Sequence, residues 1–428
     1  MNYKTYFKGK KVAVIGLGPH GEMITDIRFL IRAGAIVSLY EIRSEARIQG
    51  IISRIPGPGL ARMSIGKIDG DELLQAELII LSPDISKQSL FLKKANQAEI
   101  PIEFPHILFL KSAPVITLIG VMGASGKSTV AHLLYGMFKK SFSKVDDHNL
   151  YFIDPDLPYG ALIHLRKIKA GDIVLARIPE DMMNEYHVAR ISPHVAVITT
   201  LTADADQKVK NAFAMLDFQT YNNFIVAPDD VVDALRENEG TTSKAKMLRT
   251  KGDNASLATQ TAELFKVDPD ISERVVNSFV GLRGHHEHVK RIYGIDFYND
   301  SASVNPISTL YSLKKLVSPE AQEKNIVLIF GGAYTSHDYS RLILEIPRYV
   351  TTLILLPGSA TLGFRADMEA LTDIDLVYTT SLDEAVTLAK EYAKKGDKVL
   401  FSPGCEVYGM HMSRKERGEK FVKLVRGL

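Results

Sequence analysis

The sequence contains a single cysteine and no long hydrophobic run. Cys405 is the only thiol among 428 residues, so an internal disulfide framework is excluded and a reducing compartment is expected. The longest apolar runs, such as residues 326–330 and 353–356, have the length of strands and are far too short to span a membrane. No apolar segment of the signal-peptide kind follows the polar residues 1–11. We therefore expect a cytoplasmic protein.

The chain also has almost no net charge. Its 52 Lys and Arg residues nearly balance its 50 Asp and Glu residues, so the composition does not support binding to nucleic acid or to an anionic membrane. The basic residues of the segment 414–426 are interpreted as a solvated helix face. Repeats and low-complexity tracts are absent from the sequence. We expect a monomer that binds neither nucleic acid nor membranes.

Short apolar runs alternate with amphipathic stretches along the whole chain. This pattern is typical of βαβ units and of a mostly parallel sheet, so it predicts an α/β fold. The length predicts two or three domains at roughly 100–200 residues each, and three domains at 1–112, 113–282 and 283–428 fit best. The expected strands include residues 12–16, 36–40, 77–82, 173–176, 195–199, 223–226, 326–330, 352–356, 376–378 and 398–401.

A glycine-rich loop between an apolar strand and a helix is the most informative segment. Glycines let backbone N–H groups point at phosphate oxygens, a lysine reaches the outer phosphates, and a hydroxyl can ligate magnesium. Val121 stands where the strict P-loop has its first glycine, so this is the shorter GxxGK[ST] form. The alternative is a structural turn, but the strand–loop–helix setting favours a nucleoside triphosphate site. The segment consists of Gly123, Ala124, Ser125, Gly126, Lys127, Ser128 and Thr129.

A second glycine loop follows the first expected strand. Its pattern is Gly16-x-Gly18-x-x-Gly21, and Glu41 lies about twenty residues further on, just past the second strand, as in dinucleotide-binding domains. The same glycine arrangement serves any diphosphate. Three interpretations stay open: a UDP-linked ligand, a nicotinamide dinucleotide, or a purely structural turn. A following P-loop domain suits the UDP-linked ligand better than a simple dehydrogenase.

Several further segments, in this order along the chain, resemble motifs of the Mur ligases, which build the peptide stem of peptidoglycan. They are residues 81–85 (LSPDI), 281–284 (GLRG), 299–306 (NDSASVNP), 331–340 (GGAYTSHDYS), 400–405 (LFSPGC) and 416–418 (ERG). The resemblance covers the whole chain and is greatest to the members that add D-glutamate. It implies Rossmann-like first and third domains around a central P-loop domain. The implied activity is an ATP-dependent amide ligase acting through an acyl phosphate on UDP-N-acetylmuramoyl-L-alanine and D-glutamate, with ATP and Mg²⁺.

The resemblance also implies roles for particular residues. Lys127, Asp204 and His285 are the expected catalytic residues, and Ser128 and Glu180 are the expected metal ligands. ATP is expected at residues 123–129 together with Asn299 and Asp300. The UDP-linked substrate is expected at Gly18, Pro19, His20, Glu41, Arg43 and Ser82.

Several positions depart from the family pattern, and they fall on the chemistry. Ala176 stands where the family has a magnesium-binding glutamate, and Glu180 or Asp181 could replace it only if the loop is rebuilt. Because alanine cannot ligate magnesium, two readings stay open: a diverged ligase with relocated ligands, or a non-catalytic UDP-sugar- or nucleotide-binding scaffold. A third reading, an NAD-binding oxidoreductase, does not explain Lys127. The other departures are Ala205, the lysine-free segment 211–218, His285, Ala302, Thr335, Val407 and Gly409.

Two other groups of reactive side chains have a simpler interpretation. His285, His286 and His288 surround Glu287 after the hinge, but such close spacing fits a closed zinc site poorly and favours a solvated hinge over a metal site. Cys405 lies between a strand and a loop with no base placed beside it by any motif, which favours a small packed residue over a nucleophile.

Overall fold

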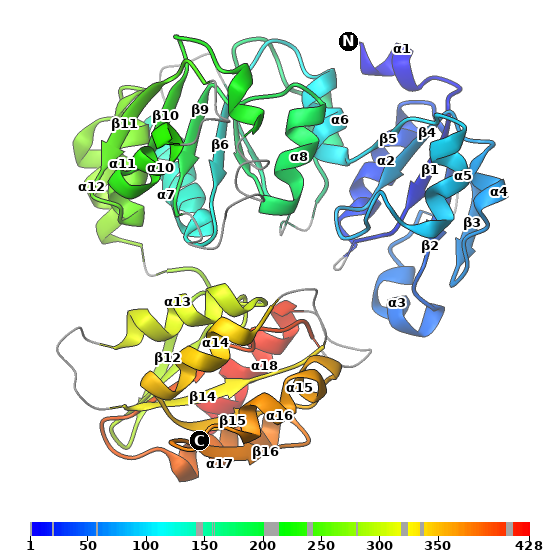
Figure 1. The fold of residues 1–428 in the computed structure, drawn as a ribbon. Helices are drawn as coiled ribbons and strands as arrows, with labels where there is room; N and C mark the ends of the chain where they lie inside the picture. The colour runs from blue at the N-terminus through cyan, green and yellow to red at the C-terminus, as the bar shows by residue number, and fades with distance from the viewer. Residues whose placement is uncertain are drawn as a thin grey trace. The chain divides into compact units, whose positions relative to one another are not determined.

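The computed structural model describes residues 2–18, 21–56, 59–142, 149–155, 157, 159–200, 214–237, 243–279, 281–317, 324–333, 338–407 and 414–428. The chain divides into two compact units, Met1–Phe279 and Val280–Leu428. The first unit contains two sheets and the second contains one, with helices on both faces of each (Figure 1). The predicted α/β fold of three domains is confirmed, while its exact domain boundaries stay predictions. No helix in these ranges combines the length and apolarity needed to cross a membrane.

The first sheet is entirely parallel, in the order β3-β2-β1-β4-β5. Its central strands β1 and β4 are almost continuous apolar runs because helices cover both of their faces. The glycine loop of residues 16–21 leaves β1 and leads into α2 (Figure 1). The strands are β1 Lys11–Ile15, β2 Ile36–Glu41, β3 Leu60–Ile65, β4 Leu78–Leu81 and β5 Ile102–Glu103; the helices are α1 Tyr3–Phe7, α2 Met23–Arg32, α3 Glu45–Ile52, α4 Gly70–Leu73, η1 Leu90–Leu92, α5 Lys93–Gln97 and α6 Pro105–Ser112.

The second sheet is also parallel, in the order β11-β10-β9-β6-β8-β7. The strand that carries the phosphate loop, β6, is central, and the helix that follows, α7, packs with α11 and α12 on one face. The strands are β6 Thr117–Met122, β7 Leu150–Ile153, β8 Ile173–Arg177, β9 Val195–Ile198, β10 Phe224–Pro228 and β11 Lys246–Thr250; the helices are α7 Lys127–Ser141, η2 Leu162–Arg166, α8 Glu180–Val188, η3 Ala214–Phe218, α10 Asp229–Glu237, α11 Asn254–Glu263 and α12 Pro269–Asn277.

The third sheet is mixed, in the order β12-β13-β17-β14-β15-β16. Only β12 and β13 are antiparallel; Tyr293 and Gly294 both have positive φ in their two-residue turn, as a type I′ hairpin requires. The last strand, β17, lies between β13 and β14. The strands are β12 Glu287–Ile292, β13 Ile295–Asn299, β14 Ile326–Phe330, β15 Val350–Leu355, β16 Asp375–Tyr378 and β17 Lys398–Phe401; the helices are α13 Pro306–Leu316, α14 Ser340–Glu345, η4 Ile346–Arg348, α15 Ser359–Gly363, α16 Arg365–Glu369, α17 Leu382–Tyr392 and α18 Arg414–Arg426.

A buried carboxyl group joins the first two sheets of the first unit. Asp26 of α2 is completely buried, and its Oδ1 accepts a hydrogen bond from the backbone N–H of Leu162 at 2.8 Å. Its Oδ2 has no hydrogen-bond partner among the described residues. A Cβ at residue 160 would lie 1.9 Å from Oδ2, so only glycine fits there. Burial raises the pKa of Asp26 to about 7, against the lowering effect of the Leu162 N–H.

This carboxyl group should make stability depend on pH. The folded state keeps the Asp26 proton up to about pH 7, whereas the unfolded chain releases it near the ordinary value of 3.8. The contribution of Asp26 to the free energy of unfolding is therefore complete below pH 3.8. It is lost as the pH rises to 7, by about 1.4 kcal/mol per pH unit at most. Asp26→Asn should remove this dependence, as measured by melting temperatures across that range. Asp230→Asn, at an exposed position of α10, is the control. An unchanged pH slope in Asp26→Asn would contradict the assignment.

Candidate functional site

The phosphate loop has the backbone that its glycines predict. It connects the end of β6 to the start of α7, with Gly123 at φ 125° and Gly126 at φ 81°. The surrounding atoms also leave no room for a side chain at either glycine. A Cβ at Gly123 would lie 2.4 Å from Thr199 Oγ1, and one at Gly126 would lie 2.4 Å from Asn254 Oδ1. Both positions therefore require glycine.

The donors of the phosphate loop are hydrogen-bonded within the loop and to the residues that follow the neighbouring strand β9. The Lys127 ammonium donates to the carbonyl oxygens of Gly123 at 2.5 Å and Ala124 at 3.0 Å. The N–H groups of Ala124 and Ser125 donate to the carbonyl and hydroxyl oxygens of Thr200, at 3.1 and 3.0 Å. These N–H and ammonium groups are the ones that hold phosphate in a P-loop, at the positive end of a helix dipole. Phosphate binding must therefore exchange these internal hydrogen bonds for bonds to the ligand.

The end of β8, next to β6, carries a cation and no carboxylate. Ala176 is completely buried in an apolar cluster together with residues of α8, including Met182 and Tyr186. Arg177 follows it, and its Nε donates to Asp154 Oδ1 at 2.7 Å. The side chains of this ion pair are 10% and 3% exposed. The polar group at this strand end is therefore a guanidinium that is nearly buried with its counter-ion.

The described residues do not by themselves form a complete magnesium site. Ser128 lies in the first turn of α7 and is partly buried, but Glu180 is exposed at the start of α8. Within the described ranges, no three His, Cys, Asp or Glu side chains come together in a way that could hold a metal. A guanidinium at the end of β8 also repels a metal cation. Asp204 lies outside the described residues, as does the side chain of Asp181.

The first glycine loop is organised by Glu41 at the end of β2. The buried Glu41 carboxylate accepts hydrogen bonds from the N–H of Leu17 at 3.0 Å and of Arg43 at 2.8 Å. It also accepts from the Arg43 guanidinium, which in turn donates to the carbonyl oxygen of Gly18 at 3.0 Å. Burial acts to raise the pKa of Glu41, but the Arg43 hydrogen bonds prevail and hold that pKa below its usual value. Glu41 and Arg43 thus fix the shape of the loop.

Two more carboxylates lie at this loop, and the sequence analysis missed both. A Cβ at Gly18 would lie 2.2 Å from the Glu22 carboxylate, so this carboxylate lies directly against the loop at Gly18. Asp84 accepts a hydrogen bond from the Ser82 hydroxyl. Gly18 and Ser82 both belong to this loop region and their role in ligand binding stays a prediction, while Pro19 and His20 are outside the described residues. The one sequence signal was Asp84 itself, an acidic residue beside the predicted ligand residue Ser82.

In the second unit, Asn299 and Asp300 belong to a buried hydrogen-bond network. Asn299 donates to Glu287 Oε2 at 3.0 Å. Asp300 accepts from the Ser402 hydroxyl at 2.7 Å and from the N–H of His286 at 3.1 Å. The two residues are 2% and 3% exposed. These two predicted ATP-binding residues are neighbours in sequence, and their side chains hold the turn that precedes β12.

The three histidines after the hinge have different surroundings. His285 is partly buried, and its N–H donates to the carbonyl oxygen of Leu282 at 3.0 Å. The ring Nε2 of His286 lies 3.1 Å from the carbonyl oxygen of Ser312, and the ring of His288 bonds Asp296 at 2.9 Å. In the described ranges they do not form a metal cluster. The interpretation of these residues as a solvated hinge stays a prediction.

The segments around Cys405 and Arg417 are structural. Arg417 is buried and donates to the carbonyl oxygens of Cys405 at 3.2 Å and Ser301 at 3.1 Å. A Cβ at Gly418 would lie 2.2 Å from the Ser301 hydroxyl, so α18 packs directly on this turn. Burial raises the pKa of the Cys405 thiol to about 11, which keeps it protonated. The interpretation of Cys405 as a packed residue is supported.

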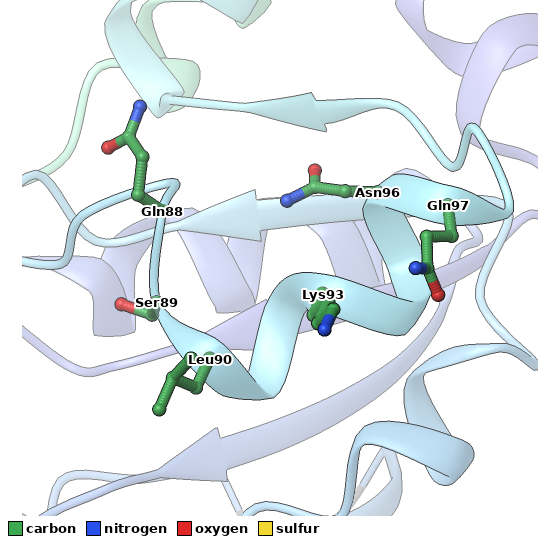
Figure 2. A pocket seen from close by; sticks show the side chains of 6 residues that line it. All are labelled: Gln88, Ser89, Leu90, Lys93, Asn96 and Gln97. Atoms are coloured by element: carbon green, nitrogen blue, oxygen red, sulfur yellow. The ribbon is translucent and has the colours of Figure 1, made fainter.

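A hollow of about 370 Å³ lies on the first domain (Figure 2). Figure 2 shows that Gln88 and Leu90 point away from one another. None of the predicted site residues lines this hollow, which is formed by Gln88, Ser89, Leu90, Lys93, Asn96 and Gln97.

Similarity to known proteins extends over nearly the whole chain. Residues 10–103 match the family model for the Mur ligase MurD-like N-terminal domain. The UDP-N-acetylmuramoylalanine–D-glutamate ligase of Roseiflexus sp. (strain RS-1) is 27% identical and aligns over 97% of this chain and 98% of its own length. The enzyme of the same name from Caldanaerobacter subterraneus subsp. tengcongensis is 26% identical and aligns over 98% of this chain and 99% of its own length.

Two solved structures share the fold. UDP-N-acetylmuramate-alanine ligase from Thermotoga maritima has a TM-score of 0.58 and 14% identity, and covers 98% of this chain and 99% of its own. A murein peptide ligase from Psychrobacter arcticus 273-4 has the same TM-score with 11% identity and the same coverage. At these identities the likeness concerns the fold.

The carboxylate at the first glycine loop should weaken binding of the UDP-linked ligand expected there. Glu22→Gln removes a negative charge next to Gly18 and should raise the affinity for UDP-N-acetylmuramoyl-L-alanine roughly fivefold, a like-charge effect of about 1 kcal/mol. Calorimetry with this ligand, UDP and NADH measures it. Glu45→Gln, at an exposed position that opens α3, is the control. Unchanged or weaker UDP binding, or NADH binding more tightly than UDP, would count against the assignment.

Proposed function

We infer that this chain, which resembles the D-glutamate-adding Mur ligases over nearly its whole length, is an ATP-dependent ligase of peptidoglycan precursor synthesis. It joins D-glutamate to UDP-N-acetylmuramoyl-L-alanine through an amide bond. The observation that carries this proposal is the glycine loop and Lys127 between β6 and α7, in a chain that aligns end to end with ligases of that name. The proposal keeps the expectation of a cytoplasmic monomer that binds neither nucleic acid nor membranes.

The reaction follows from the chemistry of the two substrates. The terminal carboxylate of UDP-N-acetylmuramoyl-L-alanine attacks the γ-phosphorus of ATP, which gives an acyl phosphate and ADP. The amino group of D-glutamate then attacks the acyl carbon, loses a proton, and expels phosphate as the amide forms. Such steps depend chiefly on positioning and on charge stabilisation of the transferring phosphoryl group.

Residues of the first unit supply the positive charge that stabilises the transferring phosphoryl group. Lys127 and the N–H groups at the start of α7 bind the β- and γ-phosphates once they leave their internal partners. The expected roles of Asn299 and Asp300 in ATP binding and of His285 in catalysis stay predictions. No step is assigned to a bound metal, because the described residues do not contain a complete set of ligands for one. Magnesium binding by Ser128, Glu180 or Asp204 stays a prediction.

One observation favours a second candidate, a non-catalytic relative that binds the same ligands. The end of β8 carries Ala176 and Arg177 and no carboxylate next to the phosphate loop. Such a protein would bind nucleotide and the UDP-linked precursor without turnover, and would act as a scaffold or regulator.

An assay of product formation separates the two candidates. The protein is supplied with ATP, Mg²⁺, UDP-N-acetylmuramoyl-L-alanine and D-glutamate, and phosphate release and product mass are measured. Lys127→Ala should lower the ATP affinity by about tenfold or more and abolish turnover, because charge-assisted hydrogen bonds to phosphate are lost. Lys139→Ala, at the far end of α7, is the control. Equal ATP affinity in Lys127→Ala and wild type would refute the site, and tight ligand binding without product would favour the scaffold.

A further inference from the structure

Arg177 and Asp154 form an ion pair in the sheet that carries the phosphate loop. Their Nε to Oδ1 distance is 2.7 Å, and both side chains are almost completely buried. They come from adjacent strand ends, because Arg177 ends β8 and Asp154 follows β7. A buried ion pair is weak support for stability, since the loss of hydration offsets the attraction of the charges. Its presence at a strand end therefore needs another explanation.

The register of the sheet puts this pair beside the phosphate loop. Arg177 is paired with Val121 of β6, two residues before Gly123, and the N–H of Ile178 donates to the carbonyl oxygen of Val121 at 2.9 Å. In parallel sheets, ligands bind at the carboxyl ends of the strands. Arg177 occupies such an end on the strand next to the loop.

The pair also lies on the same face of the sheet as α7. Residues two apart in a strand share a face, and Leu175 belongs to the apolar cluster that α7 forms with the sheet. Phe152 of β7 packs against the rings of His132 and Tyr135 of α7, at 5.2 and 5.3 Å between centroids. Asp154 is two residues closer to the carboxyl edge. Because α7 runs back from that edge, the pair lies toward the first turn of α7, where Lys127 is.

The charges at this place suit a polyanion. Lys127 and Arg177 are two cations next to a helix N-terminus, and Asp154 offsets one of them. A guanidinium offers a planar fork of donors that matches two phosphate oxygens, which an ammonium group does not. In the described part of the chain, no cluster of carboxylates could place a metal cation there instead.

We propose that Arg177, positioned by Asp154, binds the phosphates of the nucleotide and supplies at the phosphate loop the positive charge that a divalent metal would otherwise bring. This proposal rests on the proposed function, because it assumes that the loop of residues 123–126 binds a nucleoside triphosphate. Arg177 is the phosphate ligand in this arrangement, and Asp154 is a positioning residue that fixes the guanidinium.

The test is ATP binding to the full chain by calorimetry, with Mg²⁺ and with EDTA. Wild type should keep its affinity in EDTA within about tenfold, since the protein supplies the charge itself. Arg177→Met alone leaves a buried carboxylate unpaired, so the main variant is Arg177→Met with Asp154→Leu. It should lose about tenfold or more in EDTA, and Mg²⁺ should restore part of the loss. The ATP affinity of Arg177→Lys in EDTA should fall between those of the wild type and the double variant. Lysine keeps the positive charge but lacks the planar pair of donors of the guanidinium.

The controls separate a role in binding from a role in folding. Arg249→Met removes another ion-paired arginine of the same sheet, 3.0 Å from Asp229, and should leave ATP binding unchanged. Melting temperatures confirm that each variant is folded. Wild-type affinity of the double variant in EDTA would overturn the proposal while leaving the ligase assignment intact. Failure of the wild type to bind ATP under either condition would overturn both.

Discussion

Parallel strand pairing decides where the candidate ligand groups of the first unit lie. All strands of a parallel sheet point the same way, so the loops that leave their carboxyl ends gather at one edge. In the first sheet this brings the loop after β1 to Ser82 after β4. In the second it brings Gly123, Arg177 and Thr199 together from three neighbouring strands. Residues far apart in the sequence thereby share one site without any direct connection.

The sequence was sufficient for the fold and for the likeness to the Mur ligases, and both predictions are confirmed. Buried parallel strands are continuous apolar runs, so β14 and β17 were predicted at the residues where they occur. Edge strands of the first unit were missed, although β16, the outermost strand of the third sheet, was predicted at residues 376–378. Strand β3 is the outermost of its sheet and contains the exposed residues Arg62 and Met63, which break the pattern, and β7 is the outermost strand of the second sheet.

The candidate site was predictable only in its local parts. Glycine loops can be recognised from the sequence because the strand, the turn and the helix follow one another directly. The long-range partners could not be read from the sequence: Arg177 pairs with a residue 23 positions earlier, and Asp26 bonds one 136 positions later. Such contacts depend on which strands are neighbours and which side chains share a face. The expected roles of Asn299, Asp300 and His285 stay predictions, although the network around the first two is now visible.

The position of β17 has a consequence for how the protein is made. This strand is the last of the third sheet in sequence, yet it lies between β13 and β14. Until the ribosome has delivered residues 398–401, the β12–β13 hairpin and the strands β14 to β16 are two separate fragments of a sheet with open edges. Domains fold as units during synthesis, the earlier ones first. The chain of the first unit is therefore complete while the strands of the second unit still have unpaired edges.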